Sequence, residues 1–156
     1  SAPVQEQAKA LLQDLQTLSP TADAAALAPQ VASVQQRYEA LLAEATGPGD
    51  KAAATALGLA ISGRFNTLSA RTVELTALLV PAAEQAEDAL YAFDPTLKPK
   101  DGHLFLSKES AAQLREDLEG LSHAAAKATK GGDRATAQVY RDWEKVVRGG
   151  FASTSH

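Results

Sequence analysis

The chain has 156 residues, of which 45% are hydrophobic and 5% aromatic, with no Cys, no Met and a formal net charge of −4. This length is typical of one domain that buries most of its apolar surface. The absence of Cys excludes disulfides, iron–sulfur clusters, zinc–thiolate sites and thiol nucleophiles, and the mild acidity argues against a general nucleic-acid binder.

The first part of the chain predicts two helices, because apolar residues recur at steps of three and four. The first series is Val4, Ala8, Leu11, Leu15 and Leu18, and the second is Leu27, Val31, Val34, Tyr38, Leu41 and Ala45. Ser19-Pro20 is expected to cap and begin the second helix, unless that helix begins near Pro29. Gly47-Pro48-Gly49 is expected to end it, and Asp50 to cap the next.

A third and longest helix is predicted over the following residues. Its apolar face consists of Leu57, Ile61, Phe65, Leu68, Thr72, Leu75 and Leu79. Gly58 and Gly63 weaken it by about 1 kcal/mol each relative to Ala, but their small size allows another helix to approach closely. Pro81 is expected to kink or stop this helix near Leu79, and a helix resumes over residues 82–91.

Residues 94–106 predict a loop, because they contain two prolines, one glycine and no apolar period. Tyr91, Phe93 and Phe105 border this loop. Two interpretations stay open, namely a lid over the end of the bundle or an exposed aromatic anchor for a partner.

Two further helices complete the prediction. Ser107 is expected to cap the fourth helix, Gly131-Gly132 to close it, and Asp133 to cap the fifth, which ends at Gly149-Gly150. The fourth apolar face is Ala111, Leu114, Leu118, Leu121, Ala125 and Ala128, and the fifth is Thr136, Val139, Trp143, Val146 and Val147. The sequence therefore predicts an all-α, antiparallel up-down helical bundle of four to five helices, with one domain over residues 1–150 and a flexible tail over residues 151–156.

Basic residues gather near the C-terminus. Residues 127–148 hold six basic and three acidic side chains, a balance of +3, so the remainder carries −7 to reach the total of −4. Such an end can steer docking onto an anionic surface, and the alternative is a solvated helix face. The candidate partner-binding residues are Arg141, Lys145, Arg148, Tyr91, Phe93 and Phe105.

The histidines and carboxylates do not form a recognisable metal site. His103, His123 and His156 are too far apart in sequence for a zinc pair on one helix. The acidic groups at residues 84–88 and 116–119 lack the Glu-x-x-His pairs of di-iron bundles and are interpreted as a solvated surface.

Nucleophile and phosphate motifs are missing as well. The glycine-rich residues 47–51 lack the GKS or GKT ending of a phosphate loop. Arg64 and Arg71, one heptad apart, either hold an anion or flank the core with their apolar stems packed. We therefore expect no enzymatic activity, no metal and no cofactor.

The run Leu114, Leu118, Leu121, His123-Ala124-Ala125, then a polar break, Tyr140 and Val146-Val147 resembles the final helical hairpin of the PsbQ-type extrinsic subunits of photosystem II. The resemblance spans residues 107–147, and the family's Trp-containing helix followed by an Arg-rich stretch has no clear match upstream. It implies a Cys-poor, lumenal helical bundle that docks on a membrane complex and supports the oxygen-evolving centre without binding its metals.

Two hypotheses for function follow. The first is a non-catalytic, alanine-rich accessory or extrinsic protein that acts by protein–protein interaction in a larger complex, without nucleic acid, on the surface of a membrane complex. The second is a helical sensor or small-ligand-binding domain of an exported protein, which a polar pocket near Arg64 and Arg71 would support. No apolar run reaches the roughly 18 residues of a membrane span. Ser1-Ala2-Pro3 suggests a processed N-terminus or a tag remnant, and processing would fit the thylakoid lumen, the periplasm or another exported location.

Overall fold

The computed structural model describes residues 2–98, 119–120 and 122–154. In chain order its elements are α1 (Ala2–Gln16), α2 (Ala24–Glu44), α3 (Gly47–Ser69), α4 (Val73–Phe93), the 3-10 helix η1 (Pro95–Leu97), helical residues 122–130 and α6 (Arg134–Thr154). Every regular element in these ranges is helical, which confirms the predicted all-α class.

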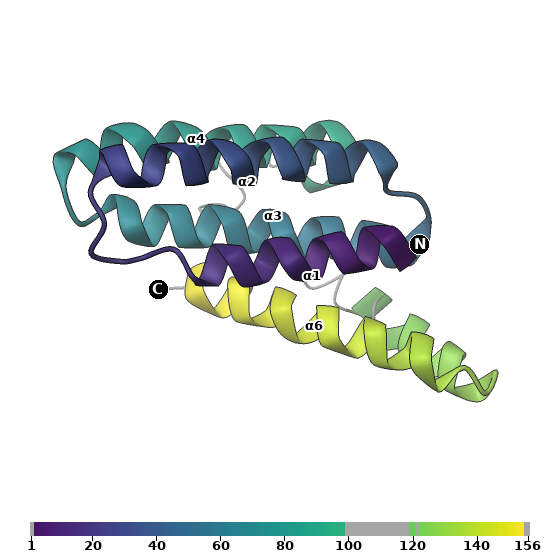
Figure 1. Cartoon of the computed structure of the whole chain (residues 1–156). Helices are drawn as coiled ribbons and strands as arrows, with labels where there is room; N and C mark the ends of the chain where they lie inside the picture. Colours follow the sequence, from purple (N-terminus) through teal and green to yellow (C-terminus); the bar gives the residue numbers. More distant parts are fainter. Residues whose placement is uncertain (1, 99–118, 121, 155–156) are drawn as a thin grey trace.

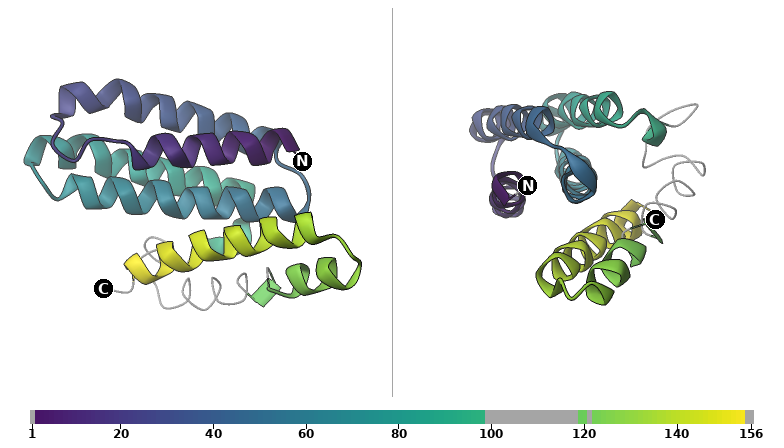
Figure 2. Two further views of the ribbon diagram at one scale, coloured as in Figure 1. Left: turned by 60° about the horizontal axis from the view of Figure 1, so that its bottom comes forward. Right: turned by 90° about the vertical axis from the view of Figure 1, so that its right-hand side faces the viewer.

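Helices α1 to α4 lie side by side and form a bundle (Figure 1). The connections α1–α2 and α3–α4 are at one end of the bundle, and the connection α2–α3 is at the other end. Residues 122–130 and α6 form a second pair of helices on the side of α1 and α3, away from α2 (Figure 2). Helix α3 therefore has a neighbour on most sides, and it packs against α1, α2, α4 and α6.

The central position of α3 follows from its composition. After Lys51, residues 52–59 are small or apolar on every face apart from Thr55, and a helix segment of this kind is stable only when other elements surround it. Residues 52–59 are all buried, including Ala53, Ala54 and Ala56 on different faces. Small alanine side chains let the surrounding helices approach α3 closely.

The first two predicted apolar faces are confirmed. The residues buried along them are Val4, Ala8, Leu11, Leu15, Leu18, Leu27, Val31, Val34, Tyr38 and Leu41. Ala45 lies at the end of the second series and is half-buried.

The start of α2 differs from the prediction. Ser19-Pro20 does not begin the helix. The Ser19 hydroxyl is hydrogen-bonded to the Thr21 hydroxyl and accepts the Thr21 backbone N–H, within the segment before α2. Asp23 is the N-cap, and its carboxylate accepts the Ala26 backbone N–H at 2.8 Å. Pro29 lies inside α2, where it removes one backbone hydrogen bond without ending the helix.

The predicted end of α2 and start of α3 also shift. Residues 47–49 form the first turn of α3 rather than a separate linker, and α2 has already ended at Glu44. Thr46 is the N-cap residue of α3. Asp50 lies within this first turn, and its carboxylate accepts the Thr46 backbone N–H at 2.8 Å. It therefore satisfies the donor of the N-cap residue, as the acidic residue of a capping box does.

The long third helix of the prediction is two helices in the structure. The break falls at residues 70–72, where the Thr72 hydroxyl accepts the Leu75 backbone N–H at 3.0 Å and caps α4. The Thr76 hydroxyl donates to the Ser69 carbonyl at 2.5 Å across the break. The expectation of a stop near Leu79 is wrong, because α4 continues through Pro81 to Phe93.

The predicted loop after α4 is partly structured. Pro95–Leu97 form a 3-10 turn, and Leu97 is buried. Phe105 and the Ser107 cap lie outside the described residues, as do the residues of the fourth apolar face up to Leu121.

The C-terminal turn is as predicted, but the end of α6 is not. Gly132 has a φ of 82°, which favours glycine, and Asp133 caps α6 by accepting the Thr136 backbone N–H at 3.0 Å. Gly149 and Gly150 do not end α6, which continues to Thr154 and includes residues expected in a tail. Two glycines weaken a helix by about 1 kcal/mol each, which is too little to stop it by themselves.

Candidate docking site on the C-terminal hairpin

We define the C-terminal hairpin as residues 122–130, the turn at residues 131–133 and α6. Its inner face is fastened to the bundle by Trp143, which is 3% exposed. The indole N–H of Trp143 donates to Gln5 Oε1 at 2.5 Å, and Gln5 Nε2 donates to the Gly49 carbonyl at 3.0 Å. Trp143 therefore joins α6 to α1 and α3 and is not an external anchor.

The remaining inner face of α6 agrees in part with the prediction. Val139 packs against the core and Thr136 is half-buried, while Ala137 is fully buried and was not predicted. The side chains of Val146 and Val147 lie outside the described part of the structure.

The outer side of the hairpin carries an open groove of about 640 Å³, here named the basic groove. It is lined by His123, Ala126, Lys127, Thr129, Lys130 and Arg141. All six side chains are exposed to solvent. The groove thus combines residues from both helices of the hairpin.

Arg141 is held in place at this groove. Its Nη2 donates to the Thr129 hydroxyl at 3.2 Å, and that hydroxyl donates in turn to the Ala125 carbonyl at 2.9 Å. A guanidinium fixed by one such bond keeps its other N–H groups available for a second acceptor.

The cations of the basic groove have no acidic partner within the part of the chain that the structure describes. Among the residues that the structure describes, no Asp or Glu forms an ion pair with Lys127, Lys130 or Arg141. The nearby Asp133 is used as the α6 cap, and its pKa is lowered by hydrogen bonds from the Thr136 hydroxyl and backbone. The groove therefore offers positive charge to an outside partner.

The predicted partner-binding residues are placed differently from one another. Arg141 and Lys145 are exposed on α6, whereas the Arg148 side chain and Phe105 lie outside the described residues. Phe93 is partly buried against the core. Tyr91 is buried, and its hydroxyl donates to Glu87 at 3.0 Å, so it is unsuited to act as a surface anchor.

Glu87 itself was expected on a solvated surface, and this interpretation is wrong. Glu87 is 3% exposed, and its carboxylate accepts hydrogen bonds from the Ser62 hydroxyl at 2.8 Å and from the Tyr91 hydroxyl. These bonds satisfy a buried carboxylate between α3 and α4, while Glu84 and Asp88 are exposed as expected.

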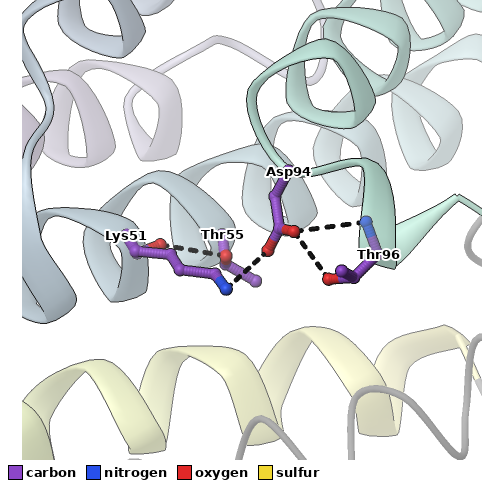
Figure 3. A network of polar contacts seen from close by, with 4 residues as sticks. All are labelled: Lys51, Thr55, Asp94 and Thr96. Atoms are coloured by element: carbon purple, nitrogen blue, oxygen red, sulfur yellow. Dashed lines mark hydrogen bonds and ion pairs between the residues drawn. The ribbon is translucent and has the colours of Figure 1, made fainter.

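A second polar network fastens the end of α4 to α3 (Figure 3). The Asp94 carboxylate accepts the Thr96 hydroxyl at 2.6 Å and lies 3.1 Å from Lys51 Nζ. Burial by itself would raise the pKa of Asp94, but the hydrogen bonds from Thr96 and the Lys51 ammonium outweigh it and lower that pKa. Asp94 is the C-cap of α4 and the N-cap of η1, so its bond to Lys51 joins this helix end to α3.

Arg64 and Arg71 do not form the polar pocket that a ligand-binding domain would need. Arg64 Nη2 donates to the Leu18 carbonyl at 2.7 Å, so it holds the segment after α1, and Arg71 is exposed. The hollow of about 350 Å³ between α1 and α2 includes neither arginine. Its charged residues Asp14 and Arg37 already pair with each other at 2.6 Å.

Sequence reasoning found the excess of basic residues but missed the groove. Lys127 and Lys130 precede the Gly131-Gly132 turn and Arg141 follows it, so a hairpin brings them to one surface. That turn was the available signal, because two helices joined by a few residues must lie alongside each other.

Neither a metal site nor a membrane span emerges within residues 2–98, 119–120 and 122–154. No group of three or more His, Cys, Asp or Glu side chains there could hold a metal ion. No helix there is both long enough and apolar enough to cross a bilayer.

No protein-family model, curated protein or solved structure matches this chain.

Proposed function

We propose that this protein is a non-catalytic accessory subunit that docks onto a larger assembly through its C-terminal hairpin. The observation that carries the proposal is the basic groove, in which Lys127, Lys130 and Arg141 face solvent without a carboxylate partner among the described residues. The role parallels that of an extrinsic subunit bound to the surface of a membrane complex, as the PsbQ-type resemblance implies.

The arrangement of the molecule supports a docking role. The four helices α1 to α4 form a packed support, and the hairpin lies on one side of them (Figure 2). A basic surface attracts an anionic partner and orients it during encounter, which increases the association rate. The rest of the chain carries a net −7, so an anionic partner surface is guided toward the hairpin and away from the bundle.

Site-specific photocrosslinking tests this proposal. A photoreactive residue replaces Ala135, which is exposed on the hairpin, or Gln36, which is exposed on α2 on the opposite side of the molecule. In an extract of the source organism, we expect a discrete adduct from the Ala135 position and none from Gln36. The adduct is expected to disappear when Lys127→Glu and Arg141→Glu are added, and to weaken at high salt.

Two results would contradict the proposal. One is an equal yield of adducts at both positions, which would indicate random collisions. The other is an Ala135 adduct that neither charge reversal nor salt changes, because the hairpin's positive charge would then have no part in binding.

A further inference from the structure

We propose that the basic groove binds an acidic peptide segment of the partner, with Arg141 as its anchoring side chain. This inference rests on the proposed docking function and names the chemistry that the hairpin recognises. It commits to one kind of occupant, a stretch of polypeptide with closely spaced carboxylates.

The first argument is the fixed position of Arg141. Its hydrogen bond to Thr129 orients the guanidinium before any partner arrives. A planar guanidinium with free N–H donors fits the two oxygens of a carboxylate, and such paired bonds are among the stronger polar contacts in proteins. Orientation in advance also reduces the entropy lost on binding.

The second argument is the spacing of the lysines. Lys127 and Lys130 are three residues apart on one helix, so both lie on the same face within one turn. Their ammonium groups can therefore receive further carboxylates of the same segment. Ala126 also lines the groove and provides a small apolar surface against which peptide methylene groups can pack.

The third argument separates a peptide from other anionic partners. His123 is the single aromatic ring that lines the groove, whereas proteins that bind single-stranded nucleic acid stack successive bases on several aromatic side chains. The one exposed large hydrophobic residue in the described part of the chain is Val73, at the start of α4. The hairpin side chains that the structure describes, up to Lys145, include no large exposed hydrophobic residue of the kind that inserts into an anionic membrane.

The test uses fluorescein-labelled hexaglutamate as a probe and measures its anisotropy with the full chain at about 50 and about 200 mM salt. Arg141→Gln is compared with Arg134→Gln, which removes the same charge from an exposed position on the same helix outside the groove. We expect Arg141→Gln to weaken binding about tenfold and Arg134→Gln less than about threefold. Unchanged thermal unfolding of both variants excludes misfolding as the cause.

A second variant keeps the test independent of Arg141. Ala126→Glu introduces negative charge and bulk into the groove without touching the Arg141–Thr129 bond, and it is also expected to abolish hexaglutamate binding. Nuclear magnetic resonance should show probe-induced shifts at the amides of Ala126 and Thr129 and none along α2.

Three outcomes would overturn the inference. Equal losses from Arg134→Gln and Arg141→Gln would mean attraction by overall charge. Tighter, Arg141-dependent binding of an oligothymidylate or of anionic phospholipid vesicles would assign the groove to nucleic acid or membrane. If hexaglutamate does not bind but the Ala135 crosslink still forms, the acidic-peptide inference is rejected and the docking function stands. If hexaglutamate binds but the Ala135 crosslink does not form, the docking function is rejected instead.

Discussion

Gly58 of α3 lies against Tyr38 of α2 and Leu90 of α4. A Cβ at this position would lie 2.6 Å from the Tyr38 hydroxyl and 2.8 Å from Leu90 Cδ2. The Tyr38 hydroxyl cannot move away freely, because it donates to the Ala54 carbonyl at 2.8 Å, and burial raises the pKa of Tyr38 and keeps it neutral. The predicted role of Gly58 in close helix approach is confirmed, whereas Gly63 has open space around its Cα.

We predict that Gly58→Ala destabilises the protein by about 1–3 kcal/mol, because overpacking outweighs the better helix propensity of Ala. Gly63→Ala is the matched control, since the same change meets no neighbour and should stabilise by about 0.5–1 kcal/mol. Urea unfolding of both variants measures the difference. If Gly58→Ala unfolds at a higher urea concentration than the parent chain, the contact with Tyr38 and Leu90 is not rigid.

Asp94 links stability to pH. Because its folded-state pKa is lowered, its stabilising contribution is fully present above the unfolded pKa near 3.9 and is lost as pH falls through the folded pKa. Asp94→Asn is therefore expected to cost about 1–2 kcal/mol at neutral pH, and the difference from the parent chain should disappear as pH falls through the lowered folded-state pKa. The measurement is chemical unfolding as a function of pH.

Asp14→Asn is the control for this prediction. Asp14 pairs with Arg37 at the surface, where the two side chains are 60% and 39% exposed, so its removal should cost well under 1 kcal/mol. If the two substitutions lower the free energy of unfolding equally, burial does not make the Asp94 interactions stronger than a surface ion pair.

At the scale of elements, the attachment of α6 combines a short chain of hydrogen bonds at Trp143 with apolar packing by Trp143, Val139 and Tyr140. Trp143, Gln5 and Gly49 connect three helices, and the ring of Trp143 belongs to the core cluster. Regions with fewer buried contacts open more readily than the centre of a domain. The hairpin has fewer buried residues than α3, so we expect it to open first.

We predict that Gln5→Ala increases amide hydrogen exchange in residues 122–145 about tenfold, which corresponds to roughly 1.4 kcal/mol, while α3 changes little. The substitution removes the acceptor of the Trp143 N–H and leaves the indole ring in place. Gln36→Ala, on the exposed side of α2, provides the control and should leave exchange unchanged. A uniform rise across α1 to α4 would mean that the hairpin and the bundle open as one unit.

Helix boundaries show a competition between local signals. Pro81 was expected to interrupt the third helix, yet the chain breaks ten residues earlier at Ala70 to Thr72. There the Thr72 hydroxyl and the Thr76–Ser69 bond satisfy the groups freed at two helix ends. A proline in an exposed position removes one hydrogen bond, and the buried face of α4, from Leu75 to Leu90, outweighs this loss.

At the scale of the whole molecule, charge and packing are divided between two parts. The bundle α1 to α4 holds most of the buried apolar residues, while the hairpin carries the basic groove. The two parts lie side by side (Figure 1). Because the inner face of α6 packs against α3, the hairpin helps to cover the core while its other side presents the groove. This division is what makes the photocrosslinking and probe-binding experiments able to address the hairpin separately.

The sequence by itself determined the helical class and most inward faces, because a period of three and four residues is a local property that any packed helix must display. The Gly131-Gly132 turn and the Asp133 cap were predictable for the same reason, since each acts within a few residues. Only the tertiary structure decided that α3 is central, that Glu87 and Tyr91 are buried together, and that Lys127, Lys130 and Arg141 share one groove. These features depend on which helices become neighbours, and that choice is made by the combined burial of residues far apart in the chain.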